Sequence, residues 1–220
     1  MNFLNNGILK ADYNFFVKNS FKISKLHLVG ELPSEIDFSE FKNLVYFRCD
    51  HFNGIVHDFG NLTHFVCKKF NRNVKNFGKL KYFECCYFNQ PVSSFCRLTH
   101  FICFKFNQKV LKFNKLRYFQ CFCFNQKISS FDKLILFQCA CFDQEVLNFG
   151  NLTHFQCLHF NQKVTCFNRL THFLCDFFDQ TITNFGKLVY FRGYTIDLLT
   201  FSKLKYLQFF YYRSLIENRK

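Results

Sequence analysis

An 18-residue internal repeat constrains this chain more than any other feature. A unit that opens with Phe followed by Asn or Asp occurs eight times in succession between residues 52 and 195, without an insertion. The opening residues of the eight units are Phe52, Phe70, Phe88, Phe106, Phe124, Phe142, Phe160 and Phe178. A unit this short cannot bury its apolar face alone. Regular repeats of this kind therefore predict a solenoid, in which each coil packs on its neighbours.

The apolar positions within the unit predict its local structure. Counted from the opening Phe, position 5 is Val or Ile, positions 8 and 14 are Phe, position 11 is Leu, and position 16 is Cys in all but the last unit. The step from position 14 to position 16 has the period of two that is typical of a strand. We therefore expect positions 14 and 16 to face inward and positions 13 and 15 to face outward. Gly, Asn or Asp at position 9 of most units predicts a turn.

These patterns predict a mainly β repeat solenoid, with one short parallel strand per 18-residue coil and irregular or 3-10 returns. The solenoid is expected over residues 34–211, in about ten coils. Residues 1–33 are expected to form an N-terminal cap with a short helix over residues 8–18, and residues 212–220 a C-terminal tail. The Asn row at position 2 is expected to satisfy buried backbone groups in the returns.

Two motifs resemble known repeats. The Leu-x-x-Phe-x-Cys pattern is similar to the strand signature of leucine-rich repeats. The opening Phe-Asn-Gln-Lys-Val at Phe106, together with Leu-Thr-His-Phe at Leu62, Leu98, Leu152 and Leu170, resembles the FNIP repeat family. That family is leucine-rich-repeat-like, and it is typical of social amoebae and of giant DNA viruses that infect amoebae. The resemblance covers residues 34–211.

The resemblance has a departure and an implication. Units of the family are several residues longer and carry a return segment with Pro and Ser, which Phe-x-x-Leu replaces here. Some members carry an F-box, and Leu32-Pro33-Ser34-Glu35 is similar to its opening. The repeat begins at once after these residues, which leaves no room for F-box helices. The resemblance implies a non-enzymatic interaction protein, located in the host cytoplasm if it is viral.

The 13 cysteines are expected to be free thiols in a reducing, cytoplasmic environment, because the chain begins with no recognisable secretion signal. No apolar stretch is long enough to predict a membrane span. The Cys row at position 16 is expected to be buried, since free Cys behaves as a small apolar residue. A zinc site formed by Cys121, Cys123, Cys139 and Cys141 is the alternative, although zinc knuckles use a different spacing. We expect no metal and no cofactor.

Position 13 predicts an interaction surface on the outer face of the sheet. Aromatic rings exposed in a row are typical of recognition surfaces, and a solvated sheet face is the alternative. The candidate residues are Tyr82, His100, Tyr118, His154, His172 and Tyr190. Only Glu84 adds a carboxylate to this face, and no nucleophile converges on a His. The sequence therefore favours a non-enzymatic scaffold that binds an unknown protein partner.

Position 10 carries a second, basic row. Its members are Lys79, Arg97, Lys115, Lys133, Arg169 and Lys187. With a formal net charge of +14, the chain could bind phosphates electrostatically along this row. Nucleic acid is therefore the alternative partner, and a solvated return face the simplest interpretation of the row. The chain is expected to be a monomer, or a homo-oligomer assembled end to end or side by side.

Overall fold

The computed structural model of the chain describes most of the repeat. The described residues are 23–28, 32, 34–74, 77–92, 95, 97–110, 115–128, 131, 133–146, 149–164, 169–180, 186–193 and 205–209. The helix expected over residues 8–18 and the tail expected over residues 212–220 lie outside them. The strands are β1 (Lys25–Leu28), β2 (Glu35–Ile36), β3 (Tyr46–Cys49), β4 (Ile55–Val56), β5 (His64–Val66), β6 (Tyr82–Cys85), β7 (His100–Cys103), β8 (Tyr118–Cys121), β9 (Leu136–Cys139), β10 (His154–Cys157), β11 (His172–Cys175), β12 (Tyr190–Gly193) and β13 (Tyr206–Phe209).

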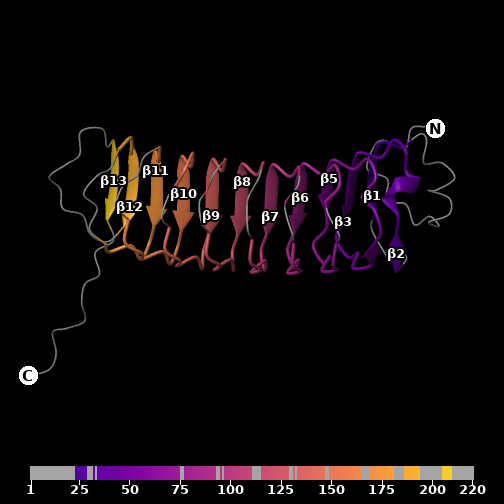
Figure 1. Cartoon of the computed structure of the whole chain (residues 1–220), viewed down its shortest axis with the longest axis horizontal. Helices are drawn as coiled ribbons and strands as arrows, with labels where there is room; N and C mark the ends of the chain where they lie inside the picture. Colours follow the sequence, from indigo (N-terminus) through magenta and orange to yellow (C-terminus); the bar gives the residue numbers. More distant parts are fainter. Residues whose placement is uncertain are drawn as a thin grey trace, which may run out of the picture.

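The strands form a parallel β-solenoid, as the repeat predicts. Within the described residues, eleven strands make one sheet whose order follows the chain from β1 through β3 and β5 to β13. Figure 1 shows them side by side along the long axis of the molecule, each lying across it. Neighbouring strands from β3 to β12 pair in parallel at an 18-residue offset, so that Phe101 lies opposite Phe119. The offset is 21 residues between β1 and β3, where Lys25 lies opposite Tyr46, and 16 residues between β12 and β13, where Tyr190 lies opposite Tyr206. The first strand, β1, lies inside the segment 1–33 that was expected to be a cap.

The returns between strands are mostly irregular. In the described part of the chain, β2 and β4 pair as a second, two-stranded sheet. Figure 1 shows β2 near the N-terminal end of the solenoid. The 3-10 turn η2 (Phe38–Glu40) follows β2, and the carboxylate of Asp37 accepts a hydrogen bond from the backbone N–H of Ser39 at its start. The main sheet therefore forms one long face of the solenoid.

The strand residues alternate between the inside and the outside, as their spacing predicts. In β8, Phe119 and Cys121 are buried, whereas Tyr118 and Gln120 are half-buried on the outer face. The same alternation holds in β3, β6, β7, β9, β11 and β12. Positions 13 and 15 of each coil therefore form continuous rows across the outer face.

The core consists of columns of Phe rings. Within a column the rings stack from coil to coil, with centroids 5.6 Å apart for Phe101 and Phe119 and 6.1 Å apart for Phe106 and Phe124. Within a coil the columns meet edge to face, as Phe119 and Phe124 do at 5.0 Å and 70°. Such pairs each add about 0.5–1.5 kcal/mol beyond the burial of apolar area. One packing arrangement is thus repeated along the solenoid.

The turn predicted at position 9 is confirmed where Gly occupies it. Gly60, Gly78, Gly150 and Gly186 have φ between 52° and 55°, a region that side chains other than Gly adopt at a cost. The turn that contains Gly60 closes with a hydrogen bond of 3.0 Å from the backbone N–H of Leu62 to the carbonyl of Phe59. This turn brings the chain from the return into the next strand.

The Asn row at position 2 supports the returns, as predicted. The backbone N–H of Asn125 donates to Oδ1 of Asn107 in the preceding coil at 2.9 Å, and Gln126 Nε2 donates to the same oxygen at 3.0 Å. The next coils repeat the pattern with Asp143, whose Oδ1 accepts from the backbone N–H of Asn161. Because only a side-chain oxygen is required in these bonds, Asp replaces Asn at residues 143 and 179 without a change of register.

Candidate interaction surface

The six residues predicted at position 13 lie in one row on the outer sheet face. Each is the first residue of its strand, and each is half-buried. The parallel register places Tyr82 opposite His100, His100 opposite Tyr118, and His172 opposite both His154 and Tyr190. We call Tyr82, His100, Tyr118, His154, His172 and Tyr190 the ring row. The structure therefore places all six in one row, with three on neighbouring coils on each side of β9.

The ring row is divided into two stacks. His100 and Tyr118 have centroids 4.4 Å apart with planes 11° apart, and His154 and His172 are 4.3 Å apart at 10°. Leu136 of β9 lies between Tyr118 and His154 in the register and interrupts the rings. The polar ring edges on either side of Leu136 offer hydrogen bonds, while the ring faces supply apolar area.

A Thr at position 12 orients the His beside it, which sequence reasoning did not detect. Thr99 Oγ1 donates to the carbonyl of Lys81 at 3.0 Å, so this hydroxyl accepts from Nδ1–H of His100 at 2.9 Å. Nε2 of the neutral imidazole then carries the lone pair. The same bonds recur at Thr63–His64, Thr153–His154 and Thr171–His172. The recurring Leu-Thr-His motif is the feature of the sequence that could have indicated this Thr–His pairing.

Burial disfavours the charged form of three histidines on this face. Partial burial lowers the pKa of His64, His100 and His154, because it removes water from the charged form. Neighbouring charge adds a smaller effect: Lys81 lowers the pKa of His64, and His172 lowers that of His154. With Nδ1–H bonded to Thr, the neutral His100 and His154 present Nε2 as a hydrogen-bond acceptor beside the apolar ring faces, which suits a mixed polar and apolar interface.

Glu84, the carboxylate expected on this face, is engaged by a neighbour. Tyr82 donates its hydroxyl hydrogen to Glu84 Oε2 at 2.6 Å. Burial, and then this bond and the negative charge of Glu84, raise the pKa of Tyr82 above its ordinary value. The pair forms a fixed polar group on β6 of the outer face.

An open groove of about 500 Å³ runs beside the ring row. Outward side chains at positions 15 and 17 line it, with the Cys row beneath. The lining residues include Glu84, Ile102, Phe104, Gln120, Phe122, Gln138, Ala140, Gln156, Leu158, Leu174, Asp176 and Arg192. Phe104 and Phe122 are 49% and 46% exposed, and their rings stack at 4.6 Å. Sequence reasoning missed these two residues because position 17 has no constant residue type.

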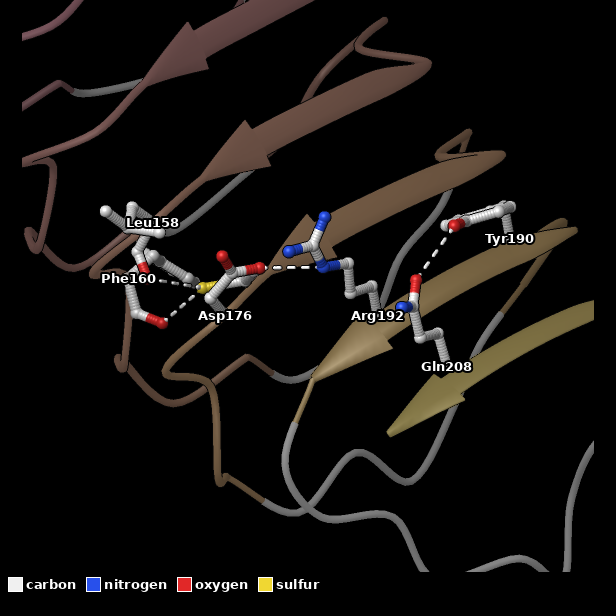
Figure 2. A network of polar contacts seen from close by, with 7 residues as sticks. Leu158, Phe160, Asp176, Tyr190, Arg192 and Gln208 are labelled. Carbon is white, nitrogen blue, oxygen red and sulfur yellow. Dashed lines mark hydrogen bonds and ion pairs between the residues drawn. The ribbon is translucent and has the colours of Figure 1, made fainter. Parts of the chain in front are cut away.

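The ends of the groove are polar and its middle is uncharged. At one end Glu84 accepts from Tyr82. At the other end Arg192 Nε forms an ion pair of 2.8 Å with Asp176 Oδ1. Figure 2 shows this pair beside the hydrogen bond between the Tyr190 hydroxyl and Gln208. Between the ends, Gln120 Nε2 donates to Gln138 Oε1 at 2.6 Å, which aligns two amides along the floor.

The basic row predicted at position 10 is exposed along the turn before each strand. Its members Lys79, Arg97, Lys115, Lys133, Arg169 and Lys187 occupy equivalent places on their coils. Lys79 Nζ and Arg169 Nη1 donate to the Asn side chains of the preceding coil, each at 2.6 Å. Two exposed basic residues at position 12, Lys81 and Arg117, lie closer in the chain to the ring row.

The Cys row is buried, as predicted, and it has a hydrogen-bonding role that sequence reasoning missed. Cys67 and Cys121 donate their Sγ–H groups to the carbonyls of Phe52 and Phe106, at 3.1 and 3.0 Å. Cys175 does the same with Phe160 and, at 3.9 Å, with Leu158 (Figure 2). Burial raises the pKa of Cys67 to about 12, so the thiol stays protonated.

The four cysteines considered as a zinc site do not share one environment. Cys121 and Cys139 are buried and donate to backbone carbonyls. Cys123 and Cys141 are half-buried and lie two residues after the ends of β8 and β9. In the described ranges, no three His, Cys, Asp or Glu side chains form a group that could hold a metal ion.

The fold and this surface define a class of protein: a parallel β-solenoid repeat protein with a phenylalanine core and an aromatic outer row. No family model, curated protein or solved structure matches the chain. Among the residues that the structure describes, no helix is long and apolar enough to cross a membrane.

Proposed function

We propose that this chain is a non-enzymatic scaffold that binds a protein partner through the outer face of its sheet. The observation that carries the proposal is the ring row beside an apolar groove on one continuous face. Aromatic side chains are enriched in the cores of interfaces. The parallel ladder fixes the backbone beneath the row, so little ordering entropy opposes binding there.

We further propose that the repeat belongs to the FNIP type and that the protein works in the cytoplasm, of a host cell if it is viral. The recurring Leu-Thr-His motif supports the assignment to the FNIP type. In each coil that carries it, the Thr hydroxyl and the His ring are hydrogen-bonded to each other. The protonated thiols of the Cys row support the cytoplasmic location, because free thiols persist in reducing compartments.

The test compares two surfaces of the same protein. Replacing His100, Tyr118 and His154 by Ala should abolish capture of the partner in a pull-down from cell lysate, performed at two salt concentrations. The matched control reverses Lys115 and Lys133 to Glu and should still capture it. Urea denaturation of both variants checks that the solenoid remains folded. Loss of capture only in the control variant would contradict the proposal.

The alternative function is electrostatic binding of nucleic acid along the basic row. Six exposed Lys and Arg residues at equivalent places on their coils favour it, together with the net charge of +14. Binding of this kind weakens steeply with salt, because phosphate contacts release counterions. A labelled single-stranded oligonucleotide that binds the wild type at low salt, but not the Lys115 and Lys133 reversal, would support this alternative.

A further inference from the structure

We propose that the groove beside the ring row binds an extended peptide segment in which apolar residues alternate with acidic ones. This inference rests on the proposed scaffold function and names the chemistry of the partner. It uses the groove lining, the amides of its floor and the charges along its two sides, all of which belong to described residues.

The length of the groove suits a short extended segment. Its lining extends from Glu84 in β6 to Arg192 in β12, across seven strands of the sheet. Neighbouring strands lie about 4.8 Å apart, so the groove is about 29 Å long. An extended chain rises about 3.3 Å per residue, and about nine residues therefore fill it. Successive side chains of such a segment point to opposite sides.

The inner side of that segment would meet an uncharged surface. Between β7 and β10 the lining carries no charged residue, and its walls present Ile102, Phe104, Phe122 and Leu158. Phe104 and Phe122 expose nearly half of their surface, so burial of these rings would supply apolar area at the centre of the contact. Apolar residues at every second place of the segment fit this lining.

The floor of the groove offers partners for a peptide backbone. Gln120, Gln138 and Gln156 occupy the same position on successive strands. Each amide has two donor hydrogens and one acceptor oxygen, and the bond from Gln120 to Gln138 uses one donor and one acceptor. The remaining groups can pair with the N–H and C=O groups of an extended chain. A purely hydrocarbon ligand would leave them without partners.

The charges beside the groove select acidic residues for the outer side of the segment. The acidic residues of the lining are engaged within the protein, Glu84 by Tyr82 and Asp176 by Arg192. The exposed charges along the sides are basic. Lys81 and Arg117 are exposed and lie beyond the ring row, each directly before a ring-row residue in the chain, Tyr82 and Tyr118.

Lys105 lies on the opposite side of the groove, with its Nζ 5.0 Å from the ring centre of Tyr87. It follows Phe104, which lines the groove, directly in the chain. Basic residues therefore lie on both sides of the groove between β6 and β8: Lys81 and Arg117 on one side, and Lys105 on the other. Acidic side chains that leave the groove in either direction meet a positive charge, which complements the segment proposed here.

Fluorescence anisotropy with the full chain tests this inference. The probe is a labelled peptide of about nine residues that alternates leucine and glutamate. We expect the wild type to bind it, and to bind a peptide with lysine in place of glutamate at least about tenfold more weakly. Phe104→Ser with Phe122→Ser should lose about tenfold in affinity. Both residues are exposed, so the variant should fold, and urea denaturation checks this.

A second variant gives an answer even if the first fails to fold. Gln138→Glu keeps the oxygen that accepts from Gln120 Nε2 and places a negative charge in the centre of the groove. It should weaken the glutamate peptide and strengthen the lysine peptide. Equal affinity for the two peptides in the wild type would overturn the inference. So would unchanged affinity in a folded groove variant.

Two further outcomes separate this inference from the proposed function. If the groove variants abolish a dimer seen by sedimentation in the wild type, a second copy of the chain is the occupant and the inference is wrong. If the His100, Tyr118 and His154 variant loses its lysate partner while no peptide binds the wild type, the scaffold function stands and the peptide inference fails. If the peptide binds the wild type, but the His100, Tyr118 and His154 variant still captures the lysate partner, the proposed function is contradicted instead.

Discussion

His154 and His172 lie face to face on neighbouring strands, with ring centroids 4.3 Å apart and planes 10° apart. Thr153 and Thr171 each bond to Nδ1 of the His that follows. Burial, and then the neighbouring His172, disfavour the charged form of His154 and lower its pKa. This pair makes the stability of the solenoid sensitive to pH.

We expect the free energy of unfolding to rise with pH through the range below about 6.5, the ordinary pKa of His. Burial, and then the neighbouring His172, hold the pKa of His154 below this value in the folded state. The unfolded chain therefore binds more protons in this range, so stability is complete above pH 6.5 and is lost as the pH falls. Urea denaturation between about pH 5 and 7.5 measures the slope. Replacing both His residues by Gln should reduce it, and an unchanged slope would refute the account.

The Phe columns predict that the stability lost on a core substitution depends on where the residue lies along the solenoid. Phe119 is fully buried and stacks between Phe101 and Phe137. Phe119→Ala should cost about 3–5 kcal/mol, because it leaves a cavity of the size of a ring. Leu207 holds the same place in the last described strand and is 39% exposed, so Leu207→Ala should cost less. Equal losses in chemical denaturation would argue against a stacked core.

The Asn row predicts which substitutions the returns accept. Asn107 Oδ1 accepts hydrogen bonds from the backbone of Asn125 and from the side chain of Gln126. Asn107→Asp keeps this oxygen, as Asp143 does in its own coil, and should leave stability nearly unchanged. Asn107→Leu removes the acceptor of both bonds and should cost about 0.5–1.5 kcal/mol, because water can reach the exposed N–H of Asn125. Thermal unfolding of the two variants compares them, and the prediction fails if Leu is tolerated as well as Asp.

The cysteines should divide into two kinetic classes. Thiols of the Cys row are buried, and burial raises the pKa of Cys85 and Cys103 to about 12. They should react slowly with a thiol reagent at pH 7.5, because the reactive thiolate is scarce. The half-buried Cys86, Cys123 and Cys141 should react first. Mass spectrometry of labelled peptides reads each site separately. Uniform fast labelling of the native protein would contradict the buried row.

The coil and its two faces could be predicted from the sequence because each position is repeated on coil after coil. One Phe-x-Cys step is weak evidence for a strand, but the same step at 18-residue intervals defines both the register and the inward face. The turn at Gly60 and Gly78 was predictable for a different reason, since a positive φ demands a residue without a Cβ.

The groove could not be predicted in the same way, because the residues that line it do not repeat. Phe104 and Phe122 stand at position 17, whereas Tyr87 and Phe177 stand at position 18. Whether such residues face water depends on how the chain bends after each strand, which a pattern of residue types does not specify. The pairing of β1 with β3 was missed for a similar reason, since the segment before the first clear repeat lacks its full set of Phe.

Leu136 provides a natural control for the ring row. It lies beside Tyr118 in the register and packs in the row without a ring. Tyr118 is half-buried and stacks on His100 at 4.4 Å, so Tyr118→Ala should cost on the order of 1 kcal/mol through lost cross-strand contact. Tyr118→Leu retains most of that contact and should cost clearly less. Urea denaturation measures both variants at pH 7.5. If Leu destabilises the protein as much as Ala does, ring stacking rather than apolar contact holds the row, and the two His–ring stacks become the main source of its rigidity.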